Sequence, residues 1–152
     1  MSRVVQGLAA GAVGTSLLNT VTYLDIALRG RPTSGVPEAD VERMAESVGV
    51  SLGADPEVAD ARKQGLGALS GLLTGFAGGA VFGVLRPLAP RVGQPLAAAL
   101  TGAAIMLATD AASTAMGTAD PRSWSPADWA SDVVPHLAYG AGVVLTFDAL
   151  RG

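Results

Sequence analysis

The chain has 152 residues, of which 49% are hydrophobic and 15% are charged, and its mean hydropathy is +0.41. In soluble domains about a quarter of all residues are usually charged. The lower charged share here, together with the 20 glycines, argues against an ordinary soluble core. The net charge of −3 and the lack of a basic run argue against a nucleic-acid partner, and the absence of cysteine excludes disulfides and thiolate chemistry.

Four apolar stretches are each close to the length of about 20 residues that a helix needs to cross a bilayer core. A backbone in lipid must satisfy its own hydrogen bonds, so all four are expected to be helices. The predicted fold class is therefore all-α: one polytopic membrane domain over residues 1–152, with four transmembrane helices in an antiparallel bundle. The predicted spans are residues 4–28, 66–85, 95–116 and 130–150.

The first stretch could be a secretory signal peptide, because it begins after Arg3 with an apolar run. It carries Asn19 and Asp25, however, and it lacks a small-x-small cleavage site followed by a soluble domain. We therefore interpret it as the first transmembrane span.

A polar segment over residues 29–63 separates the first two spans. Part of it predicts an amphipathic helix, because apolar residues recur there at the i, i+3, i+4, i+7 spacing. These residues are Val41, Met44, Ala45 and Val48. Asp55 and Pro56 predict the start of a second short helix that ends at Lys63. Two interpretations of this loop stay open: a surface loop folded onto the lipid headgroups, or a docking or gating element.

Glycine occupies every fourth position along the second span, which carries no charge between Leu66 and Leu85. Such a glycine zipper lets another helix approach closely. The zipper consists of Gly67, Gly71, Gly75, Gly79 and Gly83. The first span offers a matching surface made of Gly7, Gly11 and Gly14. The zipper could therefore contact the first span of the same chain, or it could form a homo-oligomeric interface.

Two shorter connections join the last three spans. Residues 86–93 contain Pro87 and Pro90 and predict a tight helical hairpin. Residues 117–128 lead to Trp129, a residue type that favours the membrane–water boundary. The run from Ser125 to Asp128 has a serine cap, a proline and a carboxylate, which predicts the start of the fourth helix.

Most of the strongly polar residues within the spans fall in the half of the bundle nearest the long loop. Asp110 lies about seven residues before the end of the third span and His136 about eight residues into the fourth, which places both roughly 10–12 Å from the same surface. We expect them to line a polar pocket. Its other predicted members are Asp132, Asp25, Asn19 and Tyr139.

Burial of Asp110 in its charged form is unfavourable, because placing an ionised carboxylate at the centre of a span costs about 2.5–3.5 kcal/mol of free energy. It is therefore expected to face the interior and to be paired, hydrated or protonated. His136, the only histidine, is the natural partner. Pro135 removes one helical hydrogen bond beside it and predicts a kink in the fourth span.

Structural roles compete with a functional role at each of these positions. Asp110 and His136 could form a purely structural ion pair. Asp132 could be exposed to headgroup water, and Asp25 could form an ion pair with Arg29. Tyr139 could contribute only ordinary packing.

Enzyme motifs are absent from the sequence, so no catalytic residue is predicted and the protein is not expected to be an enzyme. A single histidine without an H-x-x-E or E-x-x-H pair on one helix predicts no metal site. No cofactor is expected.

Two parts of the chain carry a family resemblance. Residues 11–15, 19–25 and 29–32 near the start, and residues 129–140 near the end, resemble the small four-span membrane proteins common in actinobacteria. They are more distantly similar to the YagU-like inner-membrane proteins. The His-Leu-Ala-Tyr-Gly run from His136 to Gly140 is the most recognisable piece. The resemblance implies a four-span architecture, with no cofactor and no catalytic residue.

Together these features predict a multi-pass protein of the inner (plasma) membrane with both termini in the cytoplasm. Its expected partners are the lipid bilayer and either further copies of itself or another membrane protein. The predicted function is a proton-linked or small-cation or solute pathway that uses the half-membrane polar pocket. The competing prediction is a non-conducting scaffold or accessory subunit that assembles through the glycine zipper.

Overall fold

The computed structural model describes residues 1–151, and over that range the chain forms helices and connections without any strand. The all-α prediction is therefore confirmed. The elements in chain order are α1 (Arg3–Arg29), α2 (Val36–Ser47), α3 (Pro56–Leu85), the 3-10 turn η1 (Arg86–Leu88), α4 (Gln94–Met116), the 3-10 turn η2 (Pro121–Ser123) and α5 (Pro126–Arg151). Helices α1, α3, α4 and α5 are each long and apolar enough to cross a membrane, by length and composition.

Local capping chemistry sets the helix ends near the predicted positions. Ser125 and Asp128 bind each other's backbone at the start of α5: the Ser125 N–H donates to Asp128 Oδ2 at 2.9 Å, and the Asp128 N–H donates to Ser125 Oγ at 3.2 Å. Gly117 ends α4 in the left-handed region, with φ +75°. Pro135 is a buried residue in the interior of α5, and the helix continues past it.

The second span differs from the prediction, because α3 starts at Pro56 and runs unbroken to Leu85. Asp55 caps it as expected, since its carboxylate accepts the Glu57 N–H at 2.8 Å. The separate short helix predicted over residues 56–63 does not exist. No proline or capping residue stands between that segment and the span, so helical hydrogen bonding continues through both. The polar loop therefore ends at Asp55, and the first turns of α3 are the charged part of a longer helix.

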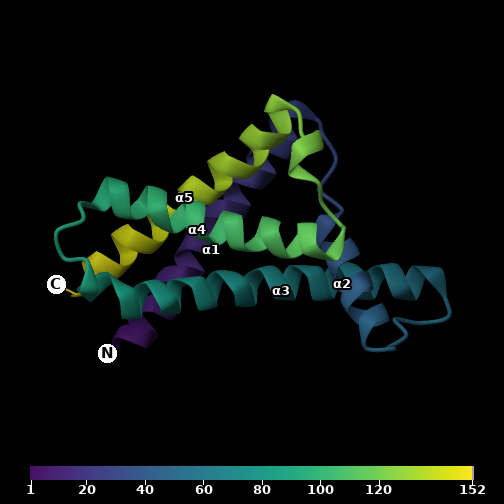
Figure 1. The fold of residues 1–152 in the computed structure, drawn as a ribbon, viewed down its shortest axis with the longest axis horizontal. Helices are drawn as coiled ribbons and strands as arrows, with labels where there is room; N and C mark the ends of the chain where they lie inside the picture. Colours follow the sequence, from purple (N-terminus) through teal and green to yellow (C-terminus); the bar gives the residue numbers. More distant parts are fainter. Residues whose placement is uncertain (152) are drawn as a thin grey trace.

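The four long helices do not contact one another equally. Helix α1 packs along both α3 and α5, and α5 also packs along α4, whereas α3 and α4 barely touch although they are consecutive (Figure 1). The connection over residues 86–93 is short, as predicted, but the two helices that it joins make few contacts. Tyr139 of α5 reaches α3 with its hydroxyl group.

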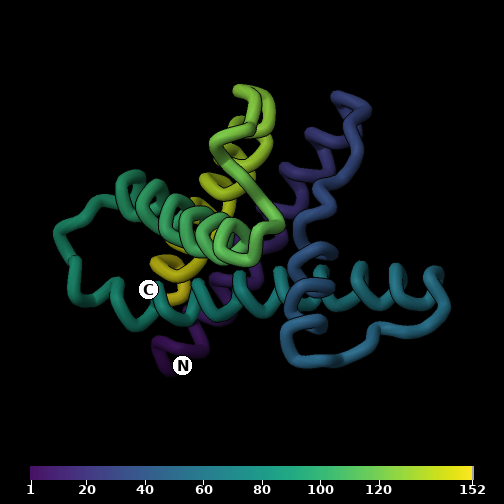
Figure 2. Tube along the Cα trace, turned by 45° about the vertical axis from the view of Figure 1, so that its right-hand side comes forward, coloured from purple at the N-terminus to yellow at the C-terminus, as the bar shows by residue number. Residues whose placement is uncertain are grey.

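The fully buried core lies in the half of the molecule nearest the two termini. Its members are Ala10, Tyr139, Val143 and Phe147. Phe82 of α3 packs edge-on against Phe147 of α5, with ring centroids 5.4 Å apart. The chain ends lie near this core, on the same side of the molecule as the connection from α3 to α4 (Figure 2).

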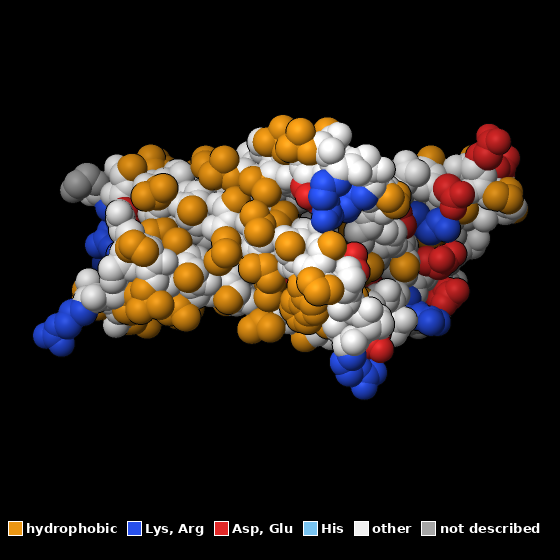
Figure 3. Space-filling view, turned by 90° about the horizontal axis from the view of Figure 1, so that it is seen from above, with side chains coloured by type: hydrophobic (Ala, Val, Ile, Leu, Met, Phe, Trp, Pro, Cys, Tyr) orange, Lys and Arg blue, Asp and Glu red, His pale blue; other side chains and the backbone are white. Residues whose placement is uncertain are grey.

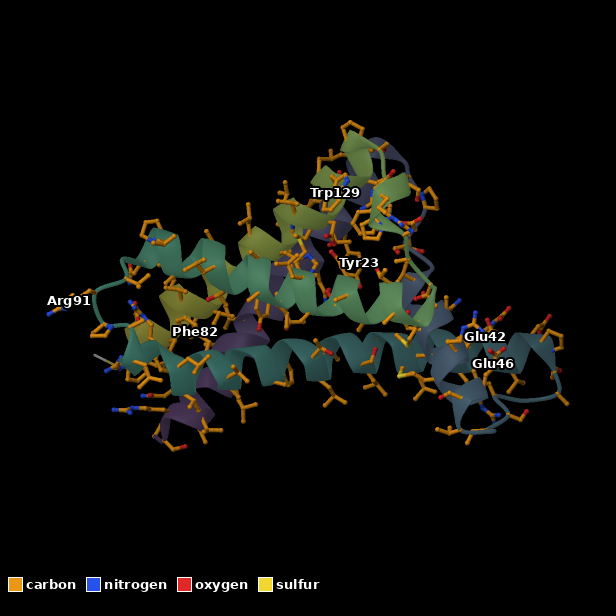
Figure 4. The ribbon with its side chains drawn as sticks, in the orientation of Figure 1. Tyr23, Glu42, Glu46, Phe82, Arg91 and Trp129 are labelled. Carbon is orange, nitrogen blue, oxygen red and sulfur yellow. The ribbon has the colours of Figure 1, made fainter. Side chains whose placement is uncertain are left out.

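Side chains of different kinds gather on different parts of the surface. Hydrophobic side chains cover the middle and one side of the molecule, and charged side chains gather towards its ends (Figure 3). Glu42 and Glu46 lie with α2 at one end, and Arg91 lies at the opposite end (Figure 4). This distribution fits a multi-pass membrane protein, whose apolar middle faces lipid.

Candidate functional site

Close backbone contacts join α1 to α3. A Cβ added to Gly11 would lie 2.6 Å from the carbonyl oxygen of Gly75, and one added to Gly79 would lie 2.5 Å from the Cα of Gly11. Gly7 and Gly83 belong to the same contact. Side chains cannot approach backbone this closely, so these positions admit only glycine unless the helices move apart.

The other two glycines of the predicted zipper have different surroundings. A Cβ on Gly67 would lie 3.2 Å from the Pro37 side chain of α2. Gly71 faces open space, since a Cβ there would meet no atom of residues 1–151 within 4 Å beyond its own helix backbone and chain neighbours. The regularly spaced glycines of α3 thus face three different surroundings: α1, α2 and a face with no neighbour among the described residues.

A second set of glycines lies where α5 crosses α1 and α4. A Cβ on Gly14 would lie 2.9 Å from the Tyr139 ring, and one on Gly140 would lie 2.7 Å from the backbone nitrogen of Gly102. Gly14 was expected at a helix contact from the sequence, but Gly102 and Gly140 were not. These two do not belong to a four-residue repeat, so no pattern in either helix marks them.

Asp25 lies in an ionic group at the end of α1 nearest the long loop. Its carboxylate oxygens lie 2.8 Å from Arg29 Nε and 2.6 Å from Arg31 Nε. Ser131 of α5 donates to the same carboxylate at 3.2 Å and also contacts Arg29. The structural role considered for Asp25, an ion pair with Arg29, is confirmed. Arg31 was not anticipated, because it lies beyond the helix end, where spacing gives no guide.

Asp110, Asp132 and His136 form a separate polar group between α4 and α5. His136 Nδ1 lies 3.2 Å from Asp132 Oδ1 and 2.8 Å from the backbone carbonyl oxygen of Asp132. The carboxyl group of Asp110 lies close enough to Asp132 and to His136 for their charges to interact. Among residues 1–151, no ion pair joins His136 directly to Asp110. His136 pairs with Asp132 because Asp132 lies one turn before it on the same helix face.

Asp132 is largely buried, so the role of a carboxylate exposed to headgroup water does not apply to it. Its side chain retains only 20% of its accessible surface. Its Oδ2 atom is buried and, within the described chain, has no hydrogen-bond partner. Buried polar atoms without partners are rare and call for a physical explanation.

The predicted pocket is therefore divided between different parts of the bundle. Asp25 belongs to the contact between α1 and α5, while Asp110, Asp132 and His136 belong to the contact between α4 and α5. Tyr139 belongs to the core, where its hydroxyl group donates to the Gly75 carbonyl oxygen at 2.7 Å. Asn19 is half-buried on α1.

A third ionic group ties the helices together at the opposite end of the bundle. Arg86 Nη2 lies 3.2 Å from Asp148 Oδ2, and Gln94 donates to the same oxygen at 3.1 Å. Arg86 also donates to the carbonyl oxygens of Ala89 and Val92, which fixes the connection between α3 and α4. This group holds α3, α4 and α5 together next to the core.

The described residues contain no group of three or more side chains placed to hold a metal ion. A carboxyl–carboxyl–imidazole chain can instead hold and pass protons, which is a common use of Asp and His inside membranes. No protein-family model, no curated protein and no solved structure matches this chain. The resemblance to YagU-like proteins stays a prediction.

Proposed function

We propose that this protein binds and releases a proton inside a membrane, at Asp110, Asp132 and His136, as part of a proton-linked pathway. The observation that carries the proposal is the pair of carboxyl groups across the contact between α4 and α5. The two groups approach each other, and Asp132 Oδ2 is buried without a partner among the described residues.

A shared proton explains this pairing. Two carboxylates held together in a poorly hydrated site repel each other, so the pair is stable when one proton lies between them. That proton supplies the missing partner for the Asp132 oxygen. His136 contacts the other oxygen of Asp132 at 3.2 Å, so a second proton can be held or passed on there.

The position of the core favours one-sided access rather than an open channel. Ala10, Tyr139, Val143 and Phe147 fill the half of the bundle on the side of the termini. A proton reaching Asp110 from the loop side therefore meets a packed apolar layer before the opposite surface. Complete transfer would require this layer to rearrange, as in carriers that expose a site to one side at a time.

The wider setting follows the sequence predictions. The protein is proposed to lie in the inner (plasma) membrane as an antiparallel four-span bundle with cytoplasmic termini, which turns the polar half outwards. The YagU-like resemblance agrees with such a membrane protein.

The test is proton movement in liposomes that contain a pH-sensitive dye. Asp110→Asn is expected to lower the rate of proton entry at least about tenfold, because loss of one proton-accepting group in a relay usually costs that much or more. Glu57→Gln, an exposed substitution on the first turn of α3, is the control and should match the parent. Size-exclusion chromatography and helical circular dichroism check that both variants fold. Equal rates in Asp110→Asn and the parent would remove the proposal.

A scaffold role is the second candidate, and the open surroundings of Gly71 favour it. If that face receives a second copy of the chain, Gly71→Leu should change the oligomer size measured by light scattering. Asp110→Asn should then have no effect on either measurement.

A further inference from the structure

Helix α2 bridges two helices that otherwise barely meet. The chain reverses after α1 and lays α2 across the beginning of α3, beside the end of α4 (Figures 1 and 2). Helix α2 packs on α3 and touches α4 at a few positions, and α3 and α4 themselves also have little contact. Close to the loop, α2 is therefore a principal link between them.

Contacts of two kinds hold α2 to α3. The first turn of α2 contacts a glycine of α3, since the Pro37 side chain lies 3.2 Å from where a Gly67 Cβ would be. Farther along, Glu42 Oε1 lies 3.4 Å from Lys63 Nζ. The glycine contact fixes how near α2 can come, and the ion pair is partly exposed to water.

A single carboxylate holds α2 to α4. Asp40 Oδ2 accepts a hydrogen bond from Ser113 Oγ at 2.7 Å, and Asp40 Oδ1 accepts one from the Thr118 hydroxyl group. Ser113 is buried, with a relative exposure of 6%. Hydrogen bonds to an ionised carboxylate are the strong ones, so Asp40 is the main polar attachment between these two helices.

This attachment lies next to the proposed proton site. Ser113 follows Asp110 by less than one turn of α4, and Thr109 lies one turn before Ser113 on the same face. Thr109 is half-buried, and its hydroxyl group donates to carbonyl oxygens of its own helix. Helix α2 is therefore attached to α4 less than one turn from Asp110.

One polar atom of α2 lacks a hydrogen-bond partner in this position. Glu38 Oε2 is buried and has no hydrogen-bond partner within residues 1–151. Water would reach this oxygen if α2 moved away from the bundle. The closed position thus gains two hydrogen bonds at Asp40 and loses hydration at Glu38.

We propose that α2, residues 36–47, is a strap that closes the loop side of the seam between α3 and α4 and controls access to Asp110, with Asp40 as its latch. The inference rests on the proposed proton site for its purpose, but its movement can be measured without any proton flux. The latch residue is a positioning residue, since it acts through Ser113 and Thr118.

Cysteine accessibility tests the strap directly, because the natural chain has no cysteine. Thr109→Cys introduces one thiol one turn before Ser113, at a half-buried site of similar size. In lipid nanodiscs, where both membrane faces are reachable, a charged, water-soluble maleimide should label this thiol slowly. Adding Asp40→Ala should raise the labelling rate about tenfold, since local opening limits the reaction and a charge-assisted attachment is lost.

The matched control is Glu46→Gln, which removes a carboxylate from the same helix. Glu46 is exposed and pairs only with Arg43 of α2 in the described chain, at 3.3 Å. It should leave the labelling rate unchanged. If Asp40→Ala fails to fold, the double variant Ser113→Ala, Thr118→Val removes the same attachment from the α4 side and should give the same increase. If the folded variant that lacks the Asp40 attachment is labelled at the same rate as the parent and the control, the proposed strap is refuted.

Proton movement then separates this inference from the proposed function. A disulfide between Asp40→Cys and Ser113→Cys should hold the strap closed and stop proton entry, and a reducing agent should restore it. Faster labelling in Asp40→Ala with no proton entry in any variant would keep the strap and refute the proton pathway. Proton entry that is lost in Asp110→Asn but unaffected by the disulfide would keep the pathway and refute the strap.

Discussion

The half of the bundle nearest the termini and the half nearest the long loop are held together by different contacts. In the first half, glycines bring α1 against α3, and Tyr139, Val143 and Phe147 fill the core. In the second half, carboxylates, hydroxyl groups and guanidinium groups join α1, α2, α4 and α5. Backbone contacts between glycines leave no room for water, whereas each polar contact can be exchanged for a contact with water. The first half is therefore expected to contribute more to stability, and the second half contains the proton site that we propose.

The largest effect is expected from a methyl group placed in the glycine contact. Gly79→Ala should lower the free energy of unfolding by about 2–3 kcal/mol, because the new Cβ would lie 2.5 Å from backbone atoms of Gly11, which cannot rotate away. Unfolding in mixed micelles with increasing SDS measures this change.

Gly71→Ala is the matched control for that prediction, with the same methyl group in the same helix. It should leave the protein as stable as the parent, or more stable by up to about 1 kcal/mol, because alanine favours a helix more than glycine does. Equal losses in both variants would mean that the glycines of α3 act through helix propensity and not through contact with α1.

An intermediate effect is expected from the hydrogen bond that crosses the core. Tyr139→Phe removes only the hydroxyl group that donates to the Gly75 carbonyl oxygen. Hydrogen bonds between membrane helices contribute about 0.6 kcal/mol on average, so a loss of that size is expected in the same unfolding measurement. Tyr23→Phe should change nothing, because Tyr23 is 62% exposed. A loss in the control as large as in Tyr139→Phe would contradict the assignment.

The smallest effect is expected outside the helices, in the connection before α5. The Arg122 guanidinium group, with Nε 2.9 Å from the carboxylate, holds the pKa of Asp120 below its ordinary value of 3.8. A lowered pKa in the folded protein stabilises it above the ordinary aspartate pKa, and this contribution disappears as the pH falls through the lowered value. Both side chains are well exposed, so solvent screens the pair.

Carbon-detected NMR of the Asp120 carboxyl group measures that pKa. Arg122→Gln should return it towards 3.8, while the thermal midpoint at neutral pH should stay close to that of the parent. A large fall in the thermal midpoint would show that this connection contributes more to stability than its exposure allows.

Much of the fold could be predicted from the sequence, because it depends on features that are local in the chain. The four spans, the α2 segment and the start of α5 follow from hydropathy, periodicity and capping residues. The unbroken α3 does not follow, because the charged residues end near Lys63 and suggest a boundary there, although charge alone does not stop a helix. The small contact between α3 and α4 does not follow either, because a single sequence does not show which helices pack side by side.

The candidate site could be predicted only in part. Depth in the membrane places Asp110 and His136 at the same level, because rise per residue is a fixed quantity. The pairing could not be predicted: His136 pairs with Asp132 of its own helix, since lateral position depends on how the helices rotate. Asp40, Ser113 and Thr118 give no signal, because they come from distant parts of the chain and match no motif.

Infrared spectroscopy of the purified protein in lipid tests most directly whether Asp110 and Asp132 share a proton. We predict a carbonyl stretching band of a protonated carboxylic acid at neutral pH, shifted in heavy water and absent in both Asp110→Asn and Asp132→Asn. No such band in the parent, or a band that survives in both variants, would contradict the shared proton.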